Sequence, residues 1–502
     1  MTQPILLTDA QMRQFITEGY LLLHADFAPE FHAAVQANLN EVYQNEGNPG
    51  NNILPRIPEL QSVFDHPVVQ GALTSVLGEG YMMHPHRHGH FNKQAEAGGW
   101  HKDSYWGHQK VRNHRPWWAM IFYFPQDVSV EMGPTGIMPG TQTYQSRVFD
   151  RDETAEEVKS AGPAGTLAIV HYDIWHRATA NISGKDRYML KFQFMRTAIP
   201  VEASWNHTEA EWSTPAELSA AVQQHEVVWR DIWNWLTGNS SAGTTEAVAD
   251  RDAAQAAKWM QELQSEDQTV RAKAADELGL LGAAAQAAAP LLAQQLEAGY
   301  EPLALNAAYA LGRMGERGIA ELLQALSHPT KAVSRAAGYG LSIAGKAAVQ
   351  GLIEQVTQQP SVNAANHAAF ALGEIGAEAA EAVPALAALH SHADENVRRT
   401  AVESLGMIGT PHEAVVAGLE RGLKDADSQV RFNAATALAR LGSKAEHAVP
   451  AIEQALQDEN RYVRATAAEA LYYVGTEKAK NALLKFLRTA RWCATTTPQN
   501  TF

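Results

Sequence analysis

A short pattern, Leu-x-x-x-Gly, recurs seven times in the second half of the chain and constrains its fold more than any other feature. Successive leucines lie 33, 30, 31, 33, 33 and 33 residues apart, at Leu278, Leu311, Leu341, Leu372, Leu405, Leu438 and Leu471. A period of this length is typical of solenoids, in which a repeat buries its apolar face only by stacking on its neighbours. Residues 251–490 are therefore predicted to form an all-helical solenoid of about seven repeats.

Each repeat is expected to contain two helices. In "DENVRRTAVESLGMIG", Val397, Ala401, Leu405 and Ile408 fall on one face at helical spacing, and the glycine ends the helix. A second helix is often entered through proline, as in "AAPLLAQQL", "AVPALAALH" and "AVPAIEQAL". The period and the recurring Val-Arg openings, such as Val397-Arg398, resemble HEAT-like repeats over roughly residues 253–487. This resemblance implies an architecture and leaves the partner open.

The first half of the chain has a different composition, and ten of the twelve tryptophans lie before residue 236. Its opening, "LTDAQMRQFITEGYLLL", predicts a helix that leads into a strand, with Thr8 or Asp9 as the N-cap. The runs "PWWAMIFYFPQ", "GTLAIVHYDIWH" and "RYMLKFQFMRTAI" are rich in aromatic and β-branched residues and predict strands. We expect a barrel or sandwich with flanking helices over residues 1–236, a linker over 237–250 and a tail over 491–502.

Composition limits the partners of the chain. The formal net charge is -15, which disfavours nucleic acid and anionic membranes, because both attract basic surfaces. No apolar run approaches the length of a membrane span, and the N-terminus does not have the pattern of a signal peptide. A single cysteine, Cys493, excludes an internal disulfide and fits a reducing compartment. A cytoplasmic location is therefore expected.

Two groups of histidines compete as a metal site. The dense group "HPHRHGH" places His84, His86, His88 and His90 on one face of an extended strand, but it includes no carboxylate. The sparse group "WHKD" contains His101 and Asp103. Three later features favour the sparse group, although His-x-Asp alone is a weak signal.

The first supporting feature is "EMGPTGIMPGTQ" (residues 131–142), which predicts a tight turn that closes a barrel hairpin. The second is the strand "GTLAIVHYDIWH", which is expected to end at His176, with His171 as the rival histidine. The third is Arg187, eleven residues later at the head of the next strand. Two histidines and one carboxylate on one face of an iron leave coordination positions open for a cosubstrate and oxygen. Arginine can pair with the far carboxylate of a dicarboxylic cosubstrate through a two-point contact.

Taken in order, "GYLLLHADF", "WHKD", "MGPTGIMPGTQ" and "HRATANISGKDRYMLKF" resemble the phytanoyl-CoA dioxygenase family of iron(II)- and 2-oxoglutarate-dependent oxygenases. The resemblance covers about residues 5–215 and implies a double-stranded β-helix of the jelly-roll or cupin type. It implies that His101, Asp103 and His176 bind Fe(II), and that Arg187 binds the distal carboxylate of 2-oxoglutarate. Lys93 and Thr135 are further candidates for the cosubstrate pocket.

Two positions depart from the family pattern. Family members often have an acidic residue directly after the glycine that opens the distal strand, where this chain has Thr166. They often have Ser or Thr two residues after the distal histidine, here His176, where this chain has Ala178. The second departure places a contact to 2-oxoglutarate in doubt, or moves it to Thr179. Asp103 is retained, whereas halogenating relatives replace this carboxylate, so hydroxylation is the expected reaction.

The expected function is hydroxylation of a small molecule by O2, with release of succinate and CO2. Candidate substrate contacts are Arg87, Trp100, Tyr105 and Trp106, which flank the metal motif in sequence. One alternative is hydroxylation of a protein or peptide docked on the repeats, and another is a non-catalytic binding scaffold. The repeats are equally compatible with a protein partner and with self-association.

Overall fold

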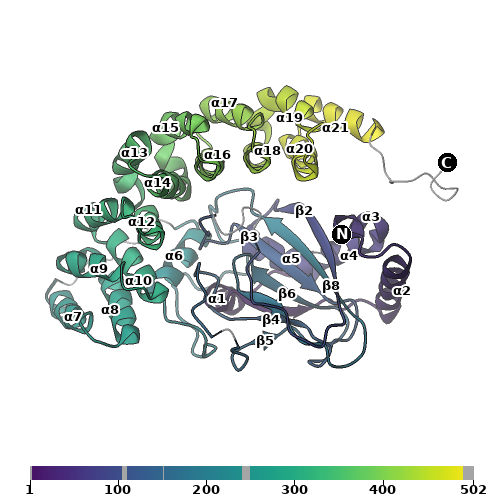
Figure 1. Cartoon of the computed structure of the whole chain (residues 1–502), viewed down its shortest axis with the longest axis horizontal. Helices are drawn as coiled ribbons and strands as arrows, with labels where there is room; N and C mark the ends of the chain where they lie inside the picture. The colour runs from purple at the N-terminus through teal and green to yellow at the C-terminus, as the bar shows by residue number, and fades with distance from the viewer. Residues whose placement is uncertain (1–2, 104–109, 151, 240–248, 490–502) are drawn as a thin grey trace. The chain divides into compact units, whose positions relative to one another are not determined.

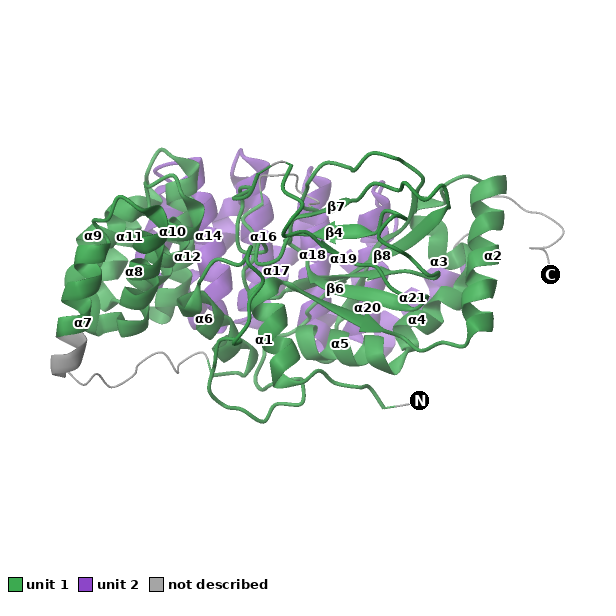
Figure 2. Cartoon of the chain, turned by 90° about the horizontal axis from the view of Figure 1, so that it is seen from below, with its two compact units in different colours: residues 1–348 green, residues 349–502 purple. Residues whose placement is uncertain are grey.

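The computed structural model describes residues 3–103, 110–150, 152–239 and 249–489, and the side chains of residues 249–253 are not described. Figure 1 labels the elements along the chain. The chain divides into two compact units, residues 1–348 and residues 349–502, which are coloured separately in Figure 2. The first unit thus contains the strand-rich half together with the first repeat helices. The domain bounds expected from the sequence stay a prediction.

The strand-rich half contains two antiparallel sheets. The larger sheet has the strand order β1-β6-β3-β8-β2, and the smaller sheet has the order β5-β4-β7. In the larger sheet, neighbouring strands are therefore never consecutive in sequence, and the expected double-stranded β-helix fold is confirmed. The strands are β1 Tyr20–His24, β2 Met82–Asn92, β3 Trp118–Tyr123, β4 Thr135–Ile137, β5 Val158–Lys159, β6 Thr166–His171, β7 His176–Ala178 and β8 Arg187–Met195.

Helices flank the larger sheet, and α5 packs on β3 and β8. The predicted helix-to-strand opening is present, and Thr8 is the N-cap of α1. The Thr8 hydroxyl accepts from the Gln11 backbone, while the Gln11 side chain accepts from the Thr8 backbone, which forms a capping box. The helices of this half are α1 Asp9–Glu18, α2 Pro29–Asn45, α3 Ile53–Arg56, α4 Gln61–Asp65, α5 Pro67–Leu77 and α6 Glu226–Leu236.

Two segments differ from the strand pattern expected from the sequence. The strand predicted to reach His176 ends at His171, and after a turn His176 begins β7 in the other sheet. The segment 131–142, expected to be only a turn, contains the strand β4. Both differences arise because the chain crosses between two sheets, a long-range arrangement that local residue preferences do not encode.

The second half consists of paired helices, as predicted. Val397, Ala401, Leu405 and Ile408 are all buried, and proline occupies the first turn of α9, α15 and α19. The helices are α7 Ala249–Glu262, α8 Gln268–Leu281, α9 Ala289–Gln295, α10 Glu301–Gly312, α11 Gly315–Leu326, α12 Lys331–Ala344, α13 Val349–Gln358, α14 Val362–Ile375, α15 Val383–Ala388, α16 Glu395–Ile408, α17 His412–Gly422, α18 Ser428–Leu441, α19 Val449–Ala455, α20 Arg461–Val474 and α21 Glu477–Thr489. Short 3-10 segments are η1 Gly50–Asn52, η2 Pro58–Leu60, η4 Gly282–Ala288, η5 Gly345–Ala348, η6 Gly376–Ala382, η7 Leu389–Ser391 and η8 Gly442–Ala448.

Apart from Gly315, which begins α11, the repeat glycines end their helices with positive φ, but in two different ways. Gly409 and Gly475 adopt the left-handed helical conformation that the sequence pattern predicts. Gly376 and Gly442 combine φ of 72° and 57° with strongly negative ψ, and a 3-10 segment follows each of them. A side chain at either kind of position would be strained, which explains the recurring glycine.

Among the described residues, every helix is too short or too polar to cross a lipid bilayer.

Candidate metal centre

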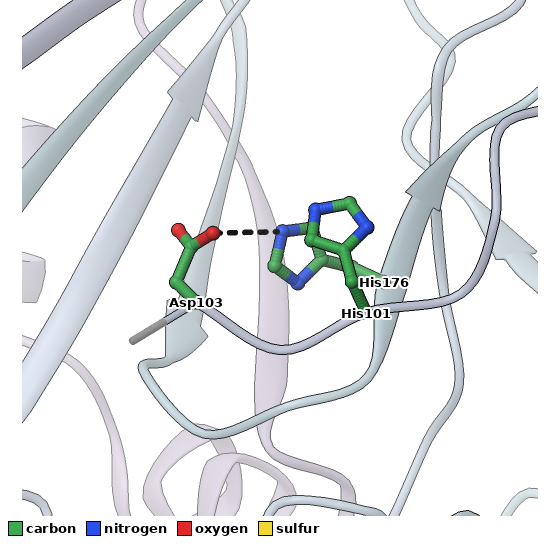
Figure 3. Close-up of side chains that lie close together, drawn as sticks. All are labelled: His101, Asp103 and His176. Carbon is green, nitrogen blue, oxygen red and sulfur yellow. Dashed lines mark ion pairs between the residues drawn. The ribbon is translucent and has the colours of Figure 1, made fainter. Parts of the chain in front are cut away.

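Three side chains from two separate segments converge in the first unit. His101 and Asp103 lie on the segment after β2, and His176 is the first residue of β7. His101 and His176 exchange backbone hydrogen bonds of 3.0 Å in both directions, which fixes the two segments side by side. One ligand atom of each residue lies within 4.8 Å of the others, and Figure 3 shows the three side chains pointing toward one another. The structure therefore brings together the three predicted iron ligands.

Backbone contacts orient both histidine rings. Nδ1 of His101 lies 3.0 Å from the carbonyl oxygen of Gly99, and Nδ1 of His176 lies 3.1 Å from that of Ile174. A carbonyl oxygen can only accept, so Nδ1 carries the proton in each ring and Nε2 keeps its lone pair. Burial lowers the pKa of His176 to about 4, against the opposing effect of Asp103. Both rings thus present a metal-binding nitrogen, in the arrangement that outer hydrogen bonds give to metal-bound histidine.

The Asp103 carboxylate is held by the larger sheet. Lys191 Nζ on β8 donates to its Oδ2 at 2.7 Å, and Gln193 Nε2 lies 3.4 Å from the same oxygen. Burial would raise the pKa of Asp103, but Lys191 and His176 outweigh this effect and hold the pKa well below its usual range. Oδ1 lies 3.9 Å from Nε2 of His176. One oxygen is therefore secured by the protein while the other faces the histidines, as a monodentate metal ligand would.

A cavity of about 210 Å³ opens beside the cluster. It is lined by His101 and His176 together with His90, Phe91, Asn92, Gln94, Thr135, Arg177, Ala178, Arg187, Met189 and Lys191. Arg187, Met189 and Lys191 alternate along β8, so all three side chains lie on the face of the sheet that borders the cavity. The cavity thus connects the candidate metal ligands with the predicted cosubstrate arginine.

The Arg187 guanidinium is buried and held from one side only. Its Nε and Nη2 both donate to the carbonyl oxygen of Gly133, at 2.9 and 2.7 Å. Nη1 is buried and has no hydrogen-bond partner among the described residues. Burial lowers the pKa of Arg187 to about 10, so the group remains charged at neutral pH. A buried cation with one unmatched donor is a ready site for a carboxylate.

Gly133 can accept from Arg187 because it has no side chain. Its φ is +69°, and a Cβ atom would lie 2.6 Å from both the Asn92 amide nitrogen and the Thr179 carbonyl oxygen. The Asn92 amide also donates to the Gly133 carbonyl, at 3.1 Å. The glycine of the "MGPTG" motif therefore fixes the guanidinium through its own carbonyl group.

Two further polar atoms in the cavity are buried without partners among the described residues, the Thr135 hydroxyl and His90 Nε2. Thr135 pairs with Ala178 across β4 and β7, so its hydroxyl lies beside the position where the family pattern has Ser or Thr. The Thr179 hydroxyl donates to the Pro134 carbonyl at 2.7 Å instead. Of the two threonines, Thr135 rather than Thr179 therefore lines the cavity and has a hydroxyl without a partner among the described residues.

The structure does not bring the other candidates to this cavity. Lys93 is largely exposed and forms an ion pair of 3.0 Å with Asp186. Trp100 stacks under the Arg177 guanidinium at 4.4 Å and contacts Phe149, while Arg87 lies on β2 outside the cavity lining. Tyr105 and Trp106 lie outside the described residues.

The dense histidine group forms part of β2, as its alternation predicts. The rings of His86 and His88 lie 5.7 Å apart, and those of His88 and His90 lie 4.9 Å apart. His84 is fully buried against Trp118. In the described part of the chain, the only group of three or more His, Cys, Asp or Glu residues close enough to hold a metal is His101, Asp103 and His176.

Comparison with known families matches each half of the chain separately. Residues 10–189 match the phytanoyl-CoA dioxygenase (PhyH) family. The chain carries a phytanoyl-CoA dioxygenase domain. Residues 256–342, 349–422 and 416–493 match HEAT repeats, so both resemblances stated from the sequence are confirmed. The family match and the His-Asp-His cluster identify the phytanoyl-CoA dioxygenase domain as a 2-oxoglutarate-dependent non-haem iron dioxygenase.

Several solved structures are similar to the phytanoyl-CoA dioxygenase domain. The non-haem α-ketoglutarate-dependent carbocyclase SnoK from nogalamycin biosynthesis is 19% identical, with a TM-score of 0.32, over 39% of this chain and 88% of that chain. EctD from S. alaskensis, solved with 2-oxoglutarate and 5-hydroxyectoine, is 15% identical, with a TM-score of 0.34, over 39% of this chain and 79% of that chain. No curated protein matches the chain.

Sequence reasoning missed Lys191 and Gln193, which hold Asp103. The sequence contained a signal for them, because Lys191 and Gln193 follow Arg187 at even spacing along a predicted strand. Their side chains therefore lie on the same face of the strand as that of Arg187. A buried lysine on that face needs an acidic partner, and Asp103 supplies it.

Proposed function

We propose that the phytanoyl-CoA dioxygenase domain hydroxylates a small-molecule substrate, with Fe(II) bound by His101, Asp103 and His176 and 2-oxoglutarate bound by Arg187. The observation that carries this proposal is the shared cavity. Two of the three metal-ligand candidates, His101 and His176, line one space of about 210 Å³ together with Arg187, whose Nη1 has no partner among the described residues. A dicarboxylic cosubstrate can reach from the metal to the guanidinium only if both line the same space.

Each residue has a distinct role in this proposal. His101 and His176 bind iron through Nε2, and Asp103 binds it through Oδ1 while Lys191 retains Oδ2. Arg187 pairs with the distal carboxylate of 2-oxoglutarate through Nη1. Ferrous iron, when bound, supplies the redox chemistry that couples decarboxylation of 2-oxoglutarate to hydroxylation by O2.

The cavity wall contributes to binding of the cosubstrate. Thr135 donates a second hydrogen bond to the carboxylate held by Arg187, because its buried hydroxyl borders the same space. Phe122 packs against the His176 ring, with centroids 5.4 Å apart, and keeps the ring in place. Met189 gives the cavity an apolar surface next to Arg187, which strengthens a charged pair by excluding water.

An anaerobic titration of the metal-free protein with Fe(II) and 2-oxoglutarate tests the proposal. The wild type is expected to develop the weak visible charge-transfer band of a metal-bound 2-oxoglutarate. His176→Ala should abolish the band, and Arg187→Met should require at least about tenfold more 2-oxoglutarate, since it removes a charge-assisted contact. His171→Asn is the matched control, because His171 is a buried histidine outside the cluster. Absence of the band in the wild type would refute the proposal and favour the scaffold alternative.

A further inference from the structure

The first HEAT repeats and the phytanoyl-CoA dioxygenase domain lie within one compact unit, residues 1–348. Buried polar groups link them. The Asp276 carboxylate on α8 accepts from the backbone N–H groups of Glu226 and Val227, at 3.0 and 2.8 Å, and so caps the start of α6. The Asn306 amide on α10 donates to the carbonyl oxygens of Gln224 and Ala272. Asp276 and Asn306 thus make specific contacts, because each of these buried side chains has defined partners.

The same contact continues toward the metal-ligand segment. The Tyr339 hydroxyl on α12 donates to the backbone carbonyl of Arg112 at 3.0 Å. The Arg112 guanidinium donates through Nη1 to the backbone carbonyl of Asp103 and to the Asp173 carboxylate, both at 2.7 Å. Arg112 is 1% exposed and Tyr339 is 5% exposed. Two hydrogen bonds, one to the backbone of Arg112 and one from its side chain, therefore join a repeat helix to the backbone of a predicted iron ligand.

Two other contacts support this connection. The ring of His114, two residues after Arg112, lies 4.0 Å from that of Tyr339, and its Nδ1 lies 2.9 Å from the Tyr309 hydroxyl on α10. Lys102, between the ligands His101 and Asp103, donates to the carbonyl oxygens of Thr141 and Asp173. The segment that carries both ligands is thus anchored on its outer side.

We infer that the first HEAT repeats form part of the metal centre, with Tyr339 and Arg112 acting as positioning residues that hold the backbone of Asp103. A single atom, Nη1 of Arg112, binds the Asp103 carbonyl and the Asp173 carboxylate at once. The Tyr339 hydroxyl holds the backbone of Arg112, and the Arg112 side chain holds the backbone of Asp103. The repeat helix therefore determines where the Asp103 carboxylate points. This inference rests on the proposed function, since it concerns the affinity of the same iron site.

The test compares three variants of the full chain. Tyr339→Phe removes only the hydroxyl that binds the backbone of Arg112. Arg112→Lys keeps the charge but ends the side chain one bond short of the Nη1 position that makes both contacts. Tyr300→Phe is the matched control, because its hydroxyl joins a repeat residue to Gln223 of the phytanoyl-CoA dioxygenase domain at 3.2 Å, away from the ligands. The Fe(II) dissociation constant is measured anaerobically at saturating 2-oxoglutarate, and the Tm of each metal-free variant is measured in parallel.

Arg112→Lys should weaken Fe(II) binding by about 10-fold to 100-fold, as changes to groups that hydrogen-bond a ligand do. Tyr339 contacts Arg112 rather than Asp103 itself, so Tyr339→Phe should weaken Fe(II) binding by a smaller factor, about 3-fold to 10-fold. Tyr300→Phe should bind Fe(II) as the wild type does, and the metal-free Tm of Tyr339→Phe should match that of Tyr300→Phe.

Wild-type iron affinity in both Tyr339→Phe and Arg112→Lys would overturn the inference and leave the proposed function intact. An affinity loss equal to that of Tyr300→Phe would also overturn it, since the repeats would then contribute only general stability. Failure of the wild type to bind Fe(II) would overturn both the inference and the proposed function.

Discussion

Arg187 shows how much of the candidate site depends on single atoms. Its guanidinium is oriented by one carbonyl oxygen, that of Gly133, which accepts from both Nε and Nη2 and leaves Nη1 without a partner among the described residues. Asp103 is oriented in the same manner, because Lys191 takes one carboxylate oxygen and leaves the other for metal. In both residues, hydrogen bonds to the protein hold some polar atoms of the side chain in place and leave another atom for the ligand.

The geometry around Gly133 gives the first prediction. In Gly133→Ala, a Cβ atom at φ +69° would meet the Asn92 amide and the Thr179 carbonyl at 2.6 Å, which shifts the carbonyl that orients Arg187. We expect the KM for 2-oxoglutarate to rise by about tenfold, the effect of losing about 1.4 kcal/mol of binding, with Fe(II) affinity retained. Steady-state kinetics and the anaerobic titration measure the two quantities.

Gly184→Ala is the matched control for this prediction. Gly184 has a similar φ of +73°, but a Cβ atom there would meet nothing within 4 Å. It therefore carries the backbone strain without the crowding. Equal increases of KM in the two variants would show that strain alone, rather than the displaced Gly133 carbonyl, weakens 2-oxoglutarate binding.

At the scale of elements, helix termini are fixed by side chains that local sequence identifies. Thr8 caps α1, and Asp267, Asp394 and Asp427 cap α8, α16 and α18. Asp9 also makes long-range contacts, because its carboxylate joins the start of α1 to a segment about 200 residues away. It accepts from Trp205 Nε1 at 2.6 Å and from the backbone N–H groups of Thr208 and Glu209 at 2.8 and 2.9 Å.

The hydrogen bonds accepted by the Asp9 carboxylate predict that the stability of the fold depends on pH. Burial would raise the pKa of Asp9, but hydrogen bonds from His207, Trp205 and Thr208 prevail and hold the pKa well below its ordinary value. A lowered pKa stabilises the folded state above the ordinary value of the carboxyl, about pH 4, and this contribution is lost as the pH falls below it. Asp9→Asn should therefore cost about 2 kcal/mol at pH 7 and progressively less as the pH falls below 4.

Urea unfolding of the wild type and Asp9→Asn between pH 3 and pH 7 measures this difference. Asp65→Asn serves as the control, because that carboxylate is exposed and its hydrogen bond is with Gln61 in the same helix. A stability difference between the wild type and Asp9→Asn that does not change with pH would contradict the prediction.

At the scale of the whole molecule, the repeats approach closely through small residues. In the first unit, a Cβ atom on Gly312 of α10 would lie 2.3 Å from the carbonyl oxygen of Gly340 on α12. Gly340 adjoins Tyr339, whose hydroxyl contacts Arg112. In the second unit, Arg398 pairs with Asp425 at 2.9 Å and Arg431 pairs with Asp458 at 2.6 Å, so one ion pair recurs between successive repeats.

Gly312→Ala should separate α10 from α12. Alanine favours the helix by about 1 kcal/mol, but crowding against a backbone carbonyl typically costs about 1–3 kcal/mol. We expect a lower Tm and, because α12 carries Tyr339, a weaker affinity for Fe(II). The control is Gly418→Ala, where the nearest atom is the flexible end of Leu405, at 3.0 Å, and the Tm should not fall. An unchanged Tm in Gly312→Ala would contradict the packing argument.

Features that depend on neighbouring residues could be predicted from the sequence. The Leu-x-x-x-Gly period predicted the repeats, Thr8 was a candidate cap of α1, and even spacing along β2 placed the four histidines on a strand. Helical periodicity, capping and strand alternation act within a few residues, so a single chain reveals them. The motifs around His101, Asp103, His176 and Arg187 implied the site through family resemblance.

Contacts between distant groups became visible only in the folded chain. The tertiary structure moved His176 from the end of one strand to the start of another in the second sheet, and it lined the cavity with Thr135 rather than Thr179, whose hydroxyl already has a partner. It also paired Lys191 with Asp103 and connected Tyr339 to the metal-ligand segment through Arg112. The physical reason is that strand pairing and buried ion pairs depend on packing between distant segments, which no local pattern in the sequence specifies.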